Sequence, residues 1–122
     1  MTPPTAGTQM DLFTRSTKTI VAMAHIGALP GSPLYDADGG MQKLIDDVAS
    51  DVEKLQAGEV DAIMFGNEND RPYQLTAAPE SIAAMTAVVS AIKPMLKVPF
   101  GVNFLWDPLA TVAIASATGA SF

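Results

Sequence analysis

The chain has 122 residues, of which 48% are apolar and 16% are charged, and its formal net charge at pH 7 is −6. A chain of this length fits one small domain or a piece of a larger one. The seven basic residues are scattered singly, which argues against nucleic-acid binding because phosphate neutralisation needs a basic patch. Cysteine is absent, so disulfides and thiolate metal sites are excluded.

Residues 1–17 are rich in Thr, Pro and Gly and predict a loose lead-in to a domain that spans 18–122. Met10, Leu12 and Phe13 are candidates for a short apolar cap within it. The segment lacks a basic leader followed by an apolar core, and no run of about 18 apolar residues occurs, so neither a signal peptide nor a spanning helix is expected. We therefore expect a cytoplasmic protein. Its acidity disfavours binding to anionic lipid by charge alone, while peripheral membrane association stays open.

The first strand is expected over residues 19–26, where an apolar run with β-branched residues at its start precedes a loop rich in Gly and Pro. A helix should follow, with Asp38 as its N-cap and Gly58 as its C-terminal stop. Its predicted apolar face consists of Met41, Leu44, Ile45, Val48, Val52 and Leu55.

A second strand is expected over residues 60–65 and a second helix from Pro79, since Pro is favoured at the first helical position. Pro94 should mark the last turn of that helix, because proline cannot donate a backbone hydrogen bond within it.

A third strand is predicted over residues 98–105. Asp107 and Pro108 form a good helix start, because Asp accepts a free backbone N–H and Pro fixes the first φ angle. The Ala-rich helix that follows should close at Gly119, and residues 120–122 are typical of the start of a fourth strand.

Strands that alternate with helices predict parallel pairing with right-handed crossovers, and therefore an α/β fold. We expect the first half of a (β/α)8 TIM barrel, cut at the start of the fourth strand, because three strand–helix units fill about 100 residues and a barrel needs about 250. A doubly wound sheet is the rival, but the loop after the first strand has no GxGxxG pattern and does not open a helix.

Polar side chains gather where the predicted strands end. The single histidine, His25, closes the first strand, the segment 66–71 follows the second, and Asn103 and Asp107 follow the third. Because the carboxyl ends of parallel strands meet at one rim, these groups should converge on a site.

The proposed catalytic residues are His25, Glu68 and Asp70. A histidine at this place can act as a general acid or base near neutral pH, or serve as a hydrogen-bonded structural residue. The two carboxylates could bind a cation, orient a sugar hydroxyl or exchange a proton, or belong to a solvated turn.

The proposed substrate-binding residues are Asn67, Asn69, Arg71, Asn103 and Asp107. Arg71 could clamp a phosphate or carboxylate, although a plain salt bridge to its acidic neighbours is favoured. Asn103 should face the barrel interior, as a polar amide in an apolar strand needs a partner. Asp107 is favoured as an N-cap.

Trp106 could wall a pocket or cover the core. No HxH, HExxH or spaced Asp loop is present, so a divalent metal is left open as a cofactor without a specific signature.

Three segments resemble the BtpA/SgcQ family: "HIGALPGSPLYDADGGM" (25–41), "VDAIMFGNENDRPY" (60–73) and "VPFGVNFLWDPLATVAIASATGASF" (98–122). The resemblance implies a (β/α)8 barrel about twice as long as this chain, with the usual phosphate-binding position in its other half. It also implies two kinds of function. One branch of the family is associated with photosystem I biogenesis at thylakoid membranes, and another looks like an enzyme of sugar or nucleoside metabolism grouped with phosphate-binding barrels.

Two functions are therefore open. The first is an enzyme that uses acid–base chemistry on a small polar metabolite, such as a sugar phosphate or a nucleoside-like compound. The second is a non-catalytic biogenesis factor that docks a membrane-protein complex, which an exposed apolar patch away from the rim would favour. In either case we expect a homo-oligomer, because the apolar edge of a partial sheet needs a cover.

Overall fold

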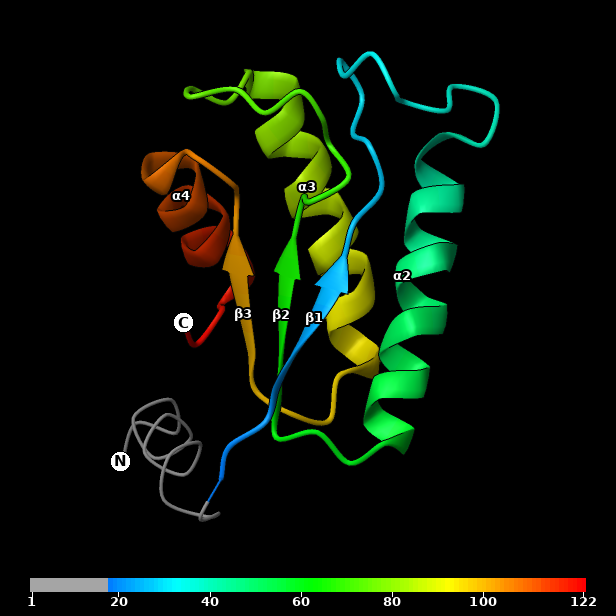
Figure 1. Cartoon of the computed structure of the whole chain (residues 1–122), viewed down its shortest axis with the longest axis vertical. Helices are drawn as coiled ribbons and strands as arrows, with labels where there is room; N and C mark the ends of the chain where they lie inside the picture. The colour runs from blue at the N-terminus through cyan, green and yellow to red at the C-terminus, as the bar shows by residue number, and fades with distance from the viewer. Residues whose placement is uncertain (1–17) are drawn as a thin grey trace.

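The computed structural model describes residues 18–122 and contains a parallel three-stranded sheet with a helix after each strand (Figure 1). The predicted lead-in over 1–17, with its cap of Met10, Leu12 and Phe13, lies outside the described residues. The elements are β1 (Val21–His25), α2 (Gly40–Ala57), β2 (Ala62–Gly66), α3 (Pro79–Ile92), the 3₁₀ helix η1 (Lys93–Met95), β3 (Phe100–Asn103) and α4 (Pro108–Thr118).

The strands lie in the order β1-β2-β3 and pair in parallel, which confirms the predicted α/β fold. All three tips therefore lie at one end of the sheet, at the top of Figure 1, together with the loops that lead into α2, α3 and α4. The observed strands overlap the predicted runs but are shorter. At Ile20, for example, the backbone N–H donates to the Asp61 side chain, 2.7 Å away, before regular strand pairing begins.

The core lies between the sheet and the helices. Ile63 and Phe65 of β2 are fully buried, and the Phe65 ring meets that of Phe100 on β3 edge to face, with centroids 5.9 Å apart. Val48 and Val88 bring the buried faces of α2 and α3 to the same cluster. Burial of each such side chain contributes about 1.5–3 kcal/mol to the free energy of folding. The face of the sheet that packs against the helices is therefore the one that stabilises it.

The start of α2 corrects one prediction. Asp38 is not the N-cap; Gly39 occupies that position and no side chain caps the helix. The Asp36 carboxylate accepts instead from the Gly39 N–H, 3.1 Å away, and the Asp36 carbonyl accepts from Gly40. Gly40 adopts a positive φ of 65° in this turn, which glycine tolerates. Asp38 therefore lies inside the turn and not at the N-cap position.

The other predicted helix ends are confirmed. Gly58 is the C-cap of α2, Pro79 is the first residue of α3, and Pro94 falls in η1 at the close of α3. Asp107 caps α4, and Gly119 ends it at a φ of 80°.

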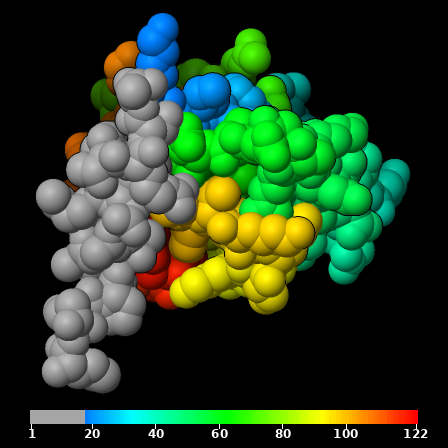
Figure 2. All heavy atoms as spheres, turned by 90° about the horizontal axis from the view of Figure 1, so that it is seen from below, coloured from blue at the N-terminus to red at the C-terminus, as the bar shows by residue number. Residues whose placement is uncertain are grey.

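The opposite end of the sheet is closed by side-chain bonds between helix ends. Gln56 at the end of α2 donates to the Met95 carbonyl and accepts from the Lys97 N–H. Figure 2, seen from below, shows the end of α2 and the η1 segment packed side by side.

Residues 120–122 continue the sheet beyond β3. Ser121 donates its N–H to the Phe100 carbonyl at 2.8 Å, and Val102 donates to the Phe122 carbonyl at 3.1 Å. These bonds agree with the prediction that a next strand begins here. Across residues 18–122, no helix combines the length and the hydropathy needed to cross a membrane.

Candidate functional site

The strand register places two predicted residues in one row. His25 pairs with Gly66, and Gly66 pairs with Asn103. Side chains of register partners in a sheet point to the same face, and they alternate along each strand with those that point to the core. His25 and Asn103 therefore lie on the sheet face opposite to the buried Phe65, with a glycine between them.

The Glu68 carboxylate fills the space above that glycine. A Cβ atom on Gly66 would lie only 2.5 Å from Glu68 Oε2, so the absence of a side chain lets the carboxylate fold back over the row. Its Oε2 atom lies 3.3 Å from His25 Nδ1. The two atoms do not form a hydrogen bond, and Oε2 is buried without a hydrogen-bond partner among residues 18–122.

Of the cluster formed by His25, Glu68 and Asn103, the imidazole and the carboxylate are the groups that can exchange protons, and the amide can only hydrogen-bond. The imidazole side chain is 49% exposed and the carboxylate side chain 23%, so a small molecule can reach both. An imidazole and a carboxylate at this separation are the two kinds of side chain that a general acid–base pair uses.

Asn67 and Asp70 lie elsewhere. The Asn67 side chain is fully buried, and its Oδ1 accepts from the Leu105 N–H at 2.8 Å, which ties β2 to the loop before α4. Asp70 Oδ1 accepts from the Leu29 N–H at 2.9 Å, which ties it to the loop before α2. Both residues line a pocket of about 240 Å³ beside the first turn of α3.

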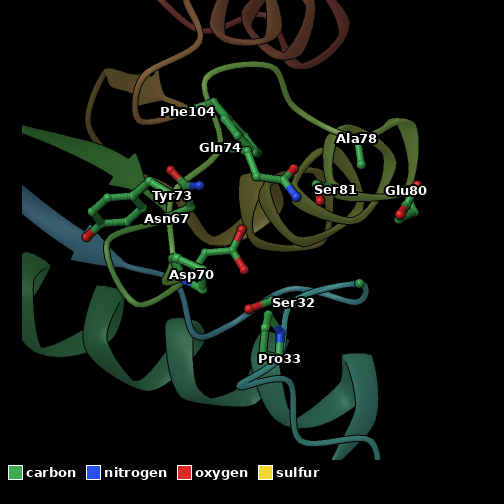
Figure 3. A pocket seen from close by; sticks show the side chains of 12 residues that line it. Ser32, Pro33, Asn67, Asp70, Tyr73, Gln74, Ala78, Glu80, Ser81 and Phe104 are labelled. Atoms are coloured by element: carbon green, nitrogen blue, oxygen red, sulfur yellow. The ribbon is translucent and has the colours of Figure 1, made fainter.

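Figure 3 shows this pocket from close by. The Asp70 carboxylate and the Gln74 amide point into the space between the loop at Ser32 and the start of α3, while the Tyr73 ring points away. Ser81, on the first turn of α3, also lines the pocket. The sequence analysis did not predict Gln74 or Ser81 as site residues. Their closeness in the chain to the predicted helix start at Pro79 was the one signal that could have indicated them.

Asp107 is engaged by backbone groups. Its Oδ1 accepts from Ala110 at 3.0 Å, and its Oδ2 accepts from Ala77 at 2.7 Å. The hydrogen bond from Ala77, followed by that from Ala110, holds the pKa of this carboxyl below its usual range despite burial. Asp107 therefore joins the loop before α3 to the start of α4, in agreement with its predicted capping role.

The remaining predicted residues face solvent. Asn69 and Arg71 are exposed on the loop after β2. The favoured salt bridge of Arg71 is wrong, because its Nε donates to the Glu68 backbone carbonyl at 3.4 Å and meets no carboxylate among residues 18–122. The exposed loop holds the guanidinium away from the Glu68 carboxylate, which has folded back over Gly66. Trp106 is 65% exposed at a φ of 71° and does not cover the core.

No three His, Asp or Glu side chains of the described part of the chain are grouped as metal ligands. The sequence predicted that His25, Glu68 and Asp70 would share one site. In the structure, His25 and Glu68 lie on the sheet face opposite to Phe65, and Asp70 lies in the pocket beside α3. The structure thus brings His25, Glu68 and Asn103 together, and separately brings together Asn67 and Asp70.

Comparison with known proteins places the chain in a family. The model of the BtpA family matches residues 16–122. The chain belongs to the BtpA family.

Two relatives illustrate its range. The sgc region protein SgcQ of Escherichia coli K12 is 47% identical over 105 residues, which are 86% of this chain and 39% of SgcQ. The photosystem I biogenesis protein BtpA of Synechocystis is 31% identical over 117 residues, covering 93% of this chain and 40% of that protein. The chain thus spans about two fifths of the length of these curated relatives.

The fold is also found in a solved structure. Dihydropteroate synthase of Xanthomonas albilineans, a TIM barrel, superposes with a TM-score of 0.59 over 86% of this chain and 34% of the enzyme, at 14% identity. An identity this low supports the fold alone. It agrees with the expectation that these strands and helices are successive units of a (β/α)8 barrel.

Proposed function

We propose that the chain supplies the acid–base site of an enzyme that acts on a small polar metabolite. The observation that supports this proposal is the position of the Glu68 carboxylate, which lies above Gly66 in the row between His25 and Asn103 and 3.3 Å from the imidazole. A buried carboxylate oxygen beside an exposed imidazole is a costly arrangement for the fold alone. It is also the arrangement that proton transfer needs.

Each residue has a role in this proposal. His25 takes or gives the substrate proton, Glu68 orients the imidazole, and Asn103 hydrogen-bonds the substrate from β3. Asp70 has no part in this proton transfer, because it lies in the separate pocket. The family resemblance favours a sugar-phosphate or nucleoside-like substrate.

The test uses a chimera, because the chain spans about two fifths of its relatives. Residues 18–122 replace the aligned segment of SgcQ, and the chimera is incubated with a pool of sugar phosphates and nucleosides whose depletion is followed by mass spectrometry. His25→Gln and Glu68→Gln should each lower turnover about 100-fold or more, the usual contribution of a general acid or base.

Glu53→Gln is the matched control, since Glu53 is exposed on α2 far from the row. It should leave turnover unchanged. Full activity of the His25→Gln chimera would show that the imidazole takes no part in the reaction. If the parent chimera depletes no compound of the pool, the proposal of an enzyme is contradicted.

A docking function is the second candidate, and one surface favours it. Trp106, Leu109 and Val112 are 65%, 83% and 64% exposed and form an apolar patch at the start of α4. An apolar patch rimmed by polar residues is typical of a protein interaction site. The relative named as a photosystem I biogenesis protein suggests a membrane-protein complex as the partner.

The docking function predicts that the chimera sediments with membranes that contain photosystem I. Replacing Leu109 and Val112 by Ser should abolish sedimentation, whereas His25→Gln should not affect it. We also propose a cytoplasmic homo-oligomer in which a second copy covers the edge of the partial sheet and leaves this patch free. A monomer in sedimentation velocity would contradict that assembly.

A further inference from the structure

The pocket beside α3 is built from buried polar side chains of separate elements. Asn67 after β2, Asp70 on the next turn and Ser81 on α3 all line it. Their exposed fractions are 1%, 8% and 7%, so each is more than nine-tenths buried. Polar side chains at this depth normally have at least one hydrogen-bond partner, and any polar atom left over here faces the open pocket, since none of the three is buried without a partner.

Each of the three keeps one polar group without a partner among residues 18–122. Leu105 donates to Asn67 Oδ1, which leaves the Nδ2 donor free. Leu29 donates to Asp70 Oδ1, which leaves the Oδ2 acceptor free. The Ser81 hydroxyl makes no hydrogen bond to any described residue, so a donor, an acceptor and a group that does both are available at one pocket.

The charge of the lining limits the ligand. Within the described range 18–122, no Lys, Arg or His lines the pocket, whereas Asp70 and Glu80 bring carboxylates to it. The N-terminus of α3 offers only a partial positive charge, which the carboxylates of Asp70 and Glu80 oppose, so a phosphate or another anion is disfavoured. An ammonium group can only donate, and it would leave the Asn67 amide donor unpaired.

We propose that this pocket binds a neutral ligand with several hydroxyl groups, such as a single sugar ring. A hydroxyl both donates and accepts, so it can satisfy Asp70 Oδ2 and Asn67 Nδ2 together. The volume of about 240 Å³ is below the roughly 300–1,000 Å³ of drug-sized sites and suits one ring. Gln74, whose amide points into the same space in Figure 3, adds a further donor and acceptor.

This site is independent of the acid–base proposal. His25, Glu68 and Asn103 do not line the pocket, and Asn67 is buried toward the core while His25 lies exposed on the opposite face of the sheet. Loss of binding in the pocket and loss of turnover at His25 can therefore be measured separately.

The experiment is a titration of the ¹⁵N-labelled 122-residue chain followed by amide NMR, with D-ribose and D-glucose as neutral probes. Inorganic phosphate and ethylammonium are the charged comparisons. At least one sugar should shift the amide signals of Leu29, Asp70 and Ser81, while phosphate and ethylammonium should not shift them as a group.

Two variants test the contacts. Asp70→Asn keeps the oxygen that accepts from Leu29 but replaces the free acceptor, and Ser81→Ala removes the free hydroxyl; each should weaken sugar binding about three- to tenfold, the effect of one hydrogen bond. Ser90→Ala is the matched control, since Ser90 is exposed on the same helix. His25→Gln should also bind sugar normally.

Three results would overturn the proposal. The first is the absence of pocket shifts with either sugar at concentrations up to 100 times those of the protein. The second is a preference for phosphate or ethylammonium over both sugars. The third is sugar binding that Asp70→Asn and Ser81→Ala, both shown by their amide spectra to be folded, leave unchanged.

Discussion

Replacement of Asn67 by Ala should destabilise the fold through a single lost hydrogen bond. The Asn67 side chain is 1% exposed, and its Oδ1 accepts from the Leu105 N–H at 2.8 Å. Alanine would leave that N–H without its acceptor and a small void beside β2. An unpaired N–H in such a place costs about 1–3 kcal/mol, so we expect a loss of about 2 kcal/mol.

The expected loss can be converted into a melting shift. Unfolding entropies of about 2.1 cal/mol/K per residue make 2 kcal/mol equal to roughly 8 °C for a chain of 122 residues. Thermal and urea unfolding, followed by circular dichroism, measure this change. The measurement is made without added ligand, so that only the bond between Asn67 and Leu105 within the protein is tested.

Asn69→Ala provides the matched control for Asn67→Ala. Asn69 lies two residues further along the same loop and is exposed, so its replacement should change stability by less than about 0.5 kcal/mol. Equal stability losses for the two variants would refute the assignment of Asn67 as the tie between β2 and the loop before α4.

Three further changes test other parts of the structure. Hydrogen bonds from Ala77 and Ala110 lower the pKa of Asp107 in the folded state, so its stabilising effect is complete above the pKa of the unfolded chain and is lost as pH falls through the lower folded value. Asp107→Asn should therefore flatten the acid limb of a stability–pH curve below about pH 4, and an unchanged limb would exclude Asp107 as its source. Gly66→Ala should keep the fold but push the Glu68 carboxylate away from the row by about 1 Å, since the new Cβ would otherwise lie 2.5 Å from Oε2; a crystal structure with Glu68 in place would contradict this. Gly119→Ala should cost about 1–2 kcal/mol in urea unfolding because a φ of 80° disfavours a side chain, and a neutral result would contradict the cap geometry.

Much of the fold could be predicted because its signals are local. Pro79 and Gly119 mark helix ends through their own backbone preferences, and Asp107 caps α4 through a hydrogen bond to a residue three positions away. The prediction for Asp38 was wrong because Asp36 is also close enough to make a turn with Gly39. Two equivalent carboxylates compete there, and composition cannot rank them.

The candidate site was predictable only in part. Parallel pairing was enough to bring the ends of β1 and β3 to one rim, so His25 and Asn103 could be expected near each other. The loop after β2 was treated as one group of ligands, yet its side chains alternate between opposite directions. Asn67 points toward the core and Glu68 folds over the opposite face.

By itself, the sequence determined the order of strands and helices and the parallel sheet, because periodicity, proline and glycine act over a few residues. The family was indicated separately, by the resemblance of segments 25–41, 60–73 and 98–122 to its members. Only the tertiary structure decided which polar atoms stay unpaired. That outcome depends on contacts such as Leu29 with Asp70 and Leu105 with Asn67, which join residues about 40 positions apart. Such distant pairs are set by how the loops pack against each other, and no local pattern in the chain records them.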